Sequence, residues 1–80
     1  MENLNQHNIK IYQATNRSIT PSILEHLCYQ EVGIYFILKQ FGPQSYCDIE
    51  DRSSIGNKYF FIRCINTLVE NGYIVEVPNE

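Results

Sequence analysis

The spacing of apolar positions changes several times along the chain, and each change marks a different predicted element. Apolar residues alternate with others over residues 9–12, which is the two-residue period of a short, half-buried strand. Four residues alone do not exclude one helical turn. Residues 1–8 are polar and show no periodicity, so we expect a flexible N-terminal tail followed by one domain over residues 9–80.

Helical spacing begins after Thr20 and Pro21, which form a favourable helix start. The Thr hydroxyl can accept a hydrogen bond from an unpaired amide, and Pro at the first helical position lacks only a donor that would have no partner. We predict a first helix over residues 21–29 and a second over residues 31–41, ended by Gly42 and Pro43. The second helix is apolar around most of its circumference, so it lies either centrally or against another subunit.

The next pattern predicts a short helix, a tight turn and a longer amphipathic helix. Ser45 can cap the short helix, which ends near residue 52, and either Ser54 or Asn57 can cap the longer one, which ends near residue 70. At about 100° per residue, four residues of the longer helix share an inner face. They are Phe61, Cys64, Ile65 and Leu68. The opposite face carries Tyr59, Arg63, Asn66 and Glu70.

A final strand is predicted over residues 73–77, because Asn71 and Gly72 close the preceding helix and alternation then resumes until Pro78. The segment over residues 9–12 could pair with this strand, from the same subunit or from a partner. The sequence therefore predicts a mainly α member of the α+β class, with about four helices and a minimal two-stranded wing.

The chain length, the net charge and the longest apolar run each bear on which partners the protein can have. An 80-residue domain buries roughly 60–65% of its unfolded surface, so a homodimer would add needed burial, with Val32, Tyr35 and Phe36 as the expected interface. The net charge of −3 is the opposite of the balance that favours phosphate binding. The longest apolar run, residues 32–38, is too short to span a membrane, so we expect a soluble protein with no membrane partner.

The cysteines give no catalytic or metal signature. Three widely spaced cysteines, an odd number, are typical of reduced thiols in a cytoplasmic protein. A zinc site formed by His26 and Cys28 with Cys47 or Cys64 matches no familiar ligand spacing, and buried cysteines are common as small core residues. We therefore expect no metal, no cofactor and no enzymatic activity.

The order short helix, turn, longer helix and strand resembles a winged helix-turn-helix domain of the MarR and PadR type, found in bacterial and phage regulators. The resemblance covers residues 20–77 and includes the ending from Leu68 to Ile74, in which Gly72 closes the helix and an apolar strand follows directly. It implies a transcription regulator that binds double-stranded DNA. Because so little is appended to the fold, we expect a small cytoplasmic protein from a phage or another mobile element.

The resemblance also implies which residues contact DNA. The helix over residues 57–70 would lie in the major groove, where Arg63 could contact guanine and Asn57 or Asn66 adenine. Lys58 and Arg52 would contact phosphates, Ser45 and Ser54 would donate to the backbone, and Tyr59 would lie on the same face. These side chains could equally be the solvated side of an amphipathic helix.

A protein partner is the alternative. Asp48, Glu50 and Asp51 place three carboxylates on the short helix that should cross the DNA backbone, where they would repel phosphates unless they point away. A fold does not dictate one function. The domain could therefore be a protein-interaction module, such as a subunit or an inhibitor of a nucleic-acid machine, with no DNA binding of its own.

Overall fold

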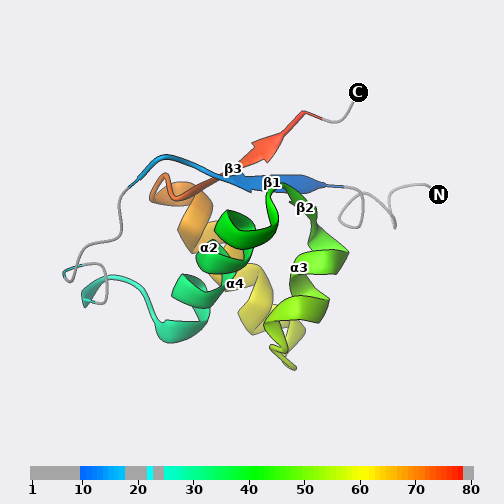
Figure 1. Cartoon of the computed structure of the whole chain (residues 1–80). Helices are drawn as coiled ribbons and strands as arrows, with labels where there is room; N and C mark the ends of the chain where they lie inside the picture. The colour runs from blue at the N-terminus through cyan, green and yellow to red at the C-terminus, as the bar shows by residue number, and fades with distance from the viewer. Residues whose placement is uncertain (1–9, 18–21, 23–24, 79–80) are drawn as a thin grey trace.

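The computed structural model describes residues 10–17, 22 and 25–78, and it shows a small α+β domain that is mainly helical (Figure 1). Its elements, in chain order, are β1 (Ile11–Ala14), α2 (Tyr29–Phe41), β2 (Gln44–Ser45), α3 (Tyr46–Ser53), α4 (Lys58–Glu70) and β3 (Ile74–Val77). The described part contains three helices, and the predicted α+β class is confirmed. Of the predicted helix over residues 21–29, residues 21, 23 and 24 lie outside the described residues, whereas residues 26–28 are not helical. The next helix begins at Tyr29 and not at residue 31 as predicted, because the Cys28 N–H donates to the Glu31 carboxylate and caps the helix there. The predicted tail over residues 1–8 lies outside the described residues.

The three strands form one antiparallel sheet in the order β2-β1-β3, so the first strand lies in the centre. Ile11 pairs with both Ser45 of β2 and Val77 of β3. The predicted pairing between the first strand and the last is thus present within one chain. The sheet has three strands and not the expected two, because residues 44–45 add a short edge strand that the sequence pattern did not indicate.

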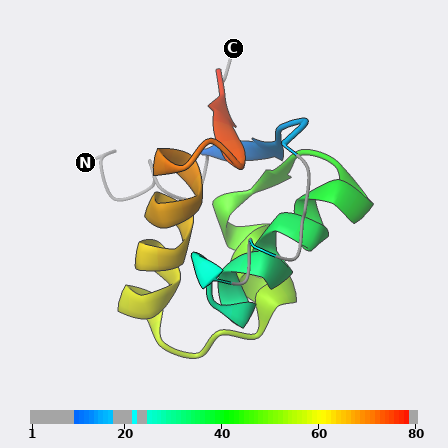
Figure 2. The same cartoon turned by 90° about the vertical axis from the view of Figure 1, so that its left-hand side faces the viewer.

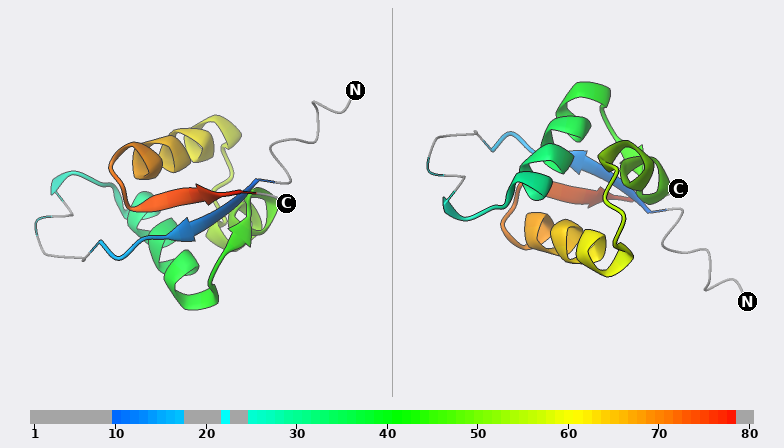
Figure 3. Two further views of the ribbon diagram at one scale, coloured as in Figure 1. Left: turned by 90° about the horizontal axis from the view of Figure 1, so that it is seen from above. Right: turned by 90° about the horizontal axis from the view of Figure 1, so that it is seen from below.

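The sheet covers one end of the helical layer, as the view from above shows (Figure 3). Tyr12 and Ile74 are buried, whereas Val75 is 42% exposed on the outer side. Backbone hydrogen bonds hold β1 in this register at both ends: the Tyr46 N–H donates to the Lys10 carbonyl, and the Thr15 N–H donates to the Tyr73 carbonyl. The central strand runs to Ala14, two residues beyond the end of the alternation over residues 9–12.

Helix α2 supplies much of the core, with Ile34 and Leu38 nearly inaccessible. Tyr35, which we expected at a dimer interface, is instead only 1% exposed and belongs to this core. Its ring packs edge to face on Tyr73 at 5.9 Å, and its hydroxyl donates to the Arg17 carbonyl. The apolar pattern of α2 could not show which of its sides the chain itself covers.

The predicted caps and turns fix the ends of α3 and α4. The Ser45 hydroxyl accepts from the Asp48 N–H at 3.2 Å, and Asn57, one of the two candidate caps, accepts from the Phe60 N–H through Oδ1 at 2.9 Å. Gly72, with φ of 79°, reverses the chain after α4 in the positive-φ region that disfavours side chains. No helix among the described residues has the length and apolar character needed to cross a membrane.

Candidate nucleic-acid interface

The inward face of α4 determines which side of that helix is presented to solvent. All four residues predicted for this face are buried: Phe61, Cys64, Ile65 and Leu68. The Phe61 ring also packs against Tyr46 of α3, with ring centroids 5.0 Å apart. This packing joins α3 to α4 and fixes the rotation of α4 about its own axis, so the opposite face must point away from the domain.

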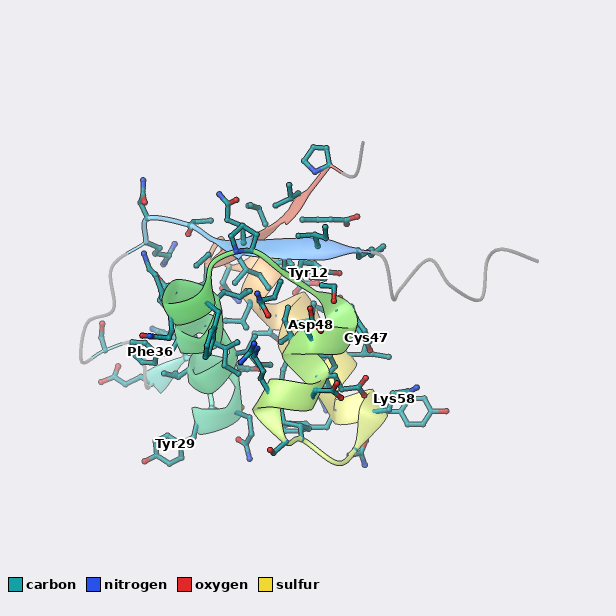
Figure 4. All side chains as sticks on the ribbon, turned by 45° about the vertical axis from the view of Figure 1, so that its right-hand side comes forward. Tyr12, Tyr29, Phe36, Cys47, Asp48 and Lys58 are labelled. Carbon is teal, nitrogen blue, oxygen red and sulfur yellow. The ribbon has the colours of Figure 1, made fainter. Side chains whose placement is uncertain are left out.

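The outward face of α4 carries the residues that the sequence predicts there. Tyr59 is 81% exposed, and Arg63, Asn66 and Glu70 are also exposed. Lys58 begins the helix and projects from its first turn (Figure 4). This face therefore presents a phenol, an amide and one guanidinium group to solvent, with one carboxylate at the far end, and Lys58 adds a second cation at the start of the helix.

The turn between α3 and α4 places two further predicted residues next to this face. It lies at the end of the molecule opposite the sheet (Figure 2). Ser54 is exposed and takes a left-handed conformation with φ of 59°, and Asn57 is exposed directly before α4. Because Asn57 Oδ1 already accepts from the Phe60 amide, its side-chain NH2 group is the part that faces outward for another ligand.

Ser45 and Arg52 lie away from this face, at the two ends of α3. The Arg52 guanidinium stacks over the Phe41 ring at 3.8 Å, and its Nε donates to Gln44 Oε1 at 3.2 Å. These contacts hold Arg52 against the end of α2. If Arg52 contacts a phosphate, it would therefore do so through its terminal guanidinium nitrogens.

The charges around α4 are mixed. Asp48 and Asp51 are exposed on α3, while Glu50 is partly buried. Lys10 Nζ and Glu76 Oε1 form an ion pair at 3.8 Å beside the sheet. Among the residues that the structure describes, no carboxylate lies within ion-pair distance of Lys58 or Arg63. Both cations of α4 are thus open to an external anion, although carboxylates stand on the neighbouring helix.

The exposed side of α2 is where the sequence predicts a dimer interface. Phe36 is 52% exposed and Val32 is partly buried, whereas Tyr35 is in the core. Tyr29, which the sequence assigned to the preceding helix, begins α2 and is 81% exposed on the same side (Figure 4). Tyr29 precedes Phe36 by seven residues, or about two helical turns, and this spacing is the sequence signal that could have placed Tyr29 on the same side of the helix.

Residues distant in the sequence also meet where α2 begins. Cys28, Glu31 and Cys64 form a cluster in which the three ligand-type atoms lie within 4.8 Å of one another. No ligand spacing in the sequence indicates it, because Cys28 and Glu31 lie at the start of α2 whereas Cys64 lies on α4.

Comparison with known proteins identifies no relative: no family model, no curated protein and no solved structure matches this chain.

Proposed function

We propose that the protein is a small sequence-specific DNA-binding regulator of the winged helix-turn-helix type. The outward face of α4 is the observation that supports this proposal. Tyr59, Arg63 and Asn66 are all exposed there, while packing fixes the opposite side of the helix. Arginine and asparagine are the side chains that most often read guanine and adenine in the major groove.

The order of elements supports the same proposal. Helix α3, a tight turn and α4 follow one another, and β3 begins four residues after α4 ends, as a wing strand does. β1 occupies the central place in the sheet, beside β3. In this arrangement α4 would lie in the major groove and α3 would cross the backbone above it.

Each outward residue then has a distinct role. Arg63 would contact guanine O6 and N7 through two N–H groups, and Asn66 would pair with adenine N6 and N7. Lys58 and the hydroxyl of Ser54, both near the turn, would contact phosphates and set the position of the helix along the duplex.

The test measures binding to the DNA that flanks the protein's own coding region, by fluorescence anisotropy at several salt concentrations. Arg63→Ala should lose about 1–3 kcal/mol on the specific sequence and discriminate less at one base pair. Lys39→Ala, which removes the same charge from an exposed position on α2, is the matched control and should change affinity less. Unchanged binding by Arg63→Ala would reject α4 as the reading helix.

A protein partner is the second candidate, and the exposed carboxylates of α3 favour it. Asp48 is exposed on the helix beside α4 (Figure 4), and Asp51 is exposed on the same helix, where a DNA-binding surface is normally positive. Absence of any DNA binding at low salt would select this candidate, since phosphate contacts are strongest there.

We further propose that the regulator is a homodimer that uses the outward side of α2. Tyr29, Val32 and Phe36 share this side at spacings of three and four residues, and Tyr29 and Phe36 are large exposed aromatic groups. Sedimentation at micromolar concentration should show a dimer that Phe36→Asp converts to a monomer. Gln40→Asp, which adds the same charge on the same side one turn away, tests whether the aromatic ring itself is required. A monomeric wild-type protein would reject the dimer.

A further inference from the structure

Two thiols and a carboxylate converge where α2 begins beside the middle of α4. Cys28 is the residue that precedes α2, Glu31 lies in its first turn, and Cys64 comes from the inward face of α4. The two sulfur atoms and a carboxylate oxygen are all within 4.8 Å of one another. Cys47, the remaining cysteine, is exposed on α3 and is not part of this cluster.

The cluster is held in place by ordinary helix geometry. The Cys28 N–H donates to Glu31 Oε1 at 2.8 Å, and the Cys28 side chain faces the backbone N–H of Glu31 in return. Glu31 is only 9% exposed, and Cys64 is fully buried. This capping contact holds the Glu31 carboxylate beside the two thiols.

We propose that Cys28, Cys64 and Glu31 bind a thiophilic divalent cation of the Zn²⁺ class. Two thiolates and one carboxylate are a suitable ligand set for this ion. A tetrahedral ion with Zn–S bonds of about 2.3 Å places two sulfurs about 3.8 Å apart, so side-chain rotations can close the cluster around it. Cys28 is exposed, which leaves the fourth position open to water.

The test titrates reduced, chelator-treated protein with Co²⁺ and then displaces it with Zn²⁺. We expect one Co²⁺ per chain, with the near-ultraviolet charge-transfer absorption of cobalt thiolates, and a rise in melting temperature when Zn²⁺ is added. Because this readout contains no DNA, it is independent of the function proposed above.

Two variants remove a ligand but keep the helix start. Serine is a preferred N-cap, and glutamine can accept the same capping hydrogen bond as glutamate, so Cys28→Ser and Glu31→Gln should remain folded. Loss of an outer-shell partner of a metal already costs about 10- to 100-fold in affinity, so each variant should bind Co²⁺ at least about 100-fold more weakly. Cys28→Ser should also lose part of the charge-transfer absorption, and Cys47→Ser should bind like the unmodified protein.

Three results would overturn the site. One is Co²⁺ binding without charge-transfer absorption, and another is equal binding by Cys28→Ser. The third is a reduced protein that binds no metal, in particular if a mild thiol oxidant such as diamide then links Cys28 to Cys64, since the pair would be a redox-active dithiol and not a ligand set.

Discussion

The two faces of α4 follow the same helical period but differ in what constrains them. On the inner face, Phe61 and Leu68 are fully buried, and each fills space that the rest of the core defines. On the outer face, Tyr59 is 81% exposed and Arg63 and Asn66 point to solvent. Packing alone explains why the inner residues are apolar, but it does not explain which residues occupy the outer face. Binding of an external partner would explain them.

Replacing aromatic residues on opposite faces should give the largest contrast. Phe61→Ala removes a fully buried ring and should lower the free energy of unfolding by about 3–5 kcal/mol. Tyr59→Ala, two positions earlier on the outer face, should change it by less than about 0.5 kcal/mol. Urea unfolding followed by circular dichroism measures both. Similar losses in the two variants would mean that the outer face is also covered, for example by another subunit.

High pH should destabilise the domain through the inner face. In the unfolded chain the pKa of the Cys64 thiol is near 9.0, whereas burial raises it to about 12 in the folded domain. Between these values the folded state binds more protons, so the contribution of this thiol to the free energy of unfolding should be constant below about pH 9 and fall as the pH rises toward 12. Burial also raises the pKa of Tyr12 and Tyr46, which adds to the fall.

Cys64→Ala tests the contribution of this thiol. Measured with a chelator present, the variant should be less stable at neutral pH but should lose less stability on going to high pH. Cys47→Ala, which removes a thiol from an exposed position, should follow the unmodified protein across the whole range. Identical pH profiles for Cys64→Ala and the unmodified protein would assign the fall to the tyrosines.

Asn57 allows the stability and binding contributions of the outer face to be separated. Asn57→Ala removes the acceptor for the Phe60 N–H and should cost about 1 kcal/mol of stability. Asn57→Asp keeps an acceptor at this position and places a negative charge where the helix dipole favours it, so stability should be kept. DNA affinity should nevertheless fall in Asn57→Asp, because the new charge would face phosphates. Equal DNA affinity in Asn57→Asp would place the duplex away from this turn.

The smallest effect concerns the carboxylates beside the outer face. If α4 binds DNA, Asp51→Asn should strengthen DNA binding by less than about fivefold at low salt. The gain should shrink near 0.15 M salt, where the electrostatic screening length is about 8 Å. Glu76→Gln makes the same charge change on β3 and serves as the control. A loss of affinity in Asp51→Asn would contradict the assumption that this carboxylate opposes DNA.

Local patterns in the sequence predicted α3, the following turn and α4 well. The faces of α4, the Ser45 cap and the reversal at Gly72 all depend on residues within a few positions of one another, and each is present as expected. The pairing of β1 with β3 was one of the arrangements that the sequence left open, and the alternation pattern did not show that β1 extends to Ala14 or that Val75 lies on the outer side.

The features that the sequence did not indicate all depend on distant contacts. β2 has two residues and exists because β1 pairs with it, so no local pattern marks it. From the sequence alone, Tyr35 cannot be distinguished from an exposed aromatic residue. In the fold, Tyr73 packs against its ring and the Arg17 carbonyl accepts a hydrogen bond from its hydroxyl. The cluster of Cys28, Glu31 and Cys64 forms only when α2 packs beside α4, and for that reason ligand spacing in the sequence could not reveal it.

The central position of β1 has a consequence for how the chain folds. Its partners in β3 are far away along the chain, because Ile11 pairs with Val77. Closing such a long loop is entropically unfavourable and slow compared with forming helices. During synthesis β1 precedes β3, so it cannot complete its pairing until β3 has been made. We therefore expect α2, α3 and α4 to associate first and the sheet to form in the last step of folding.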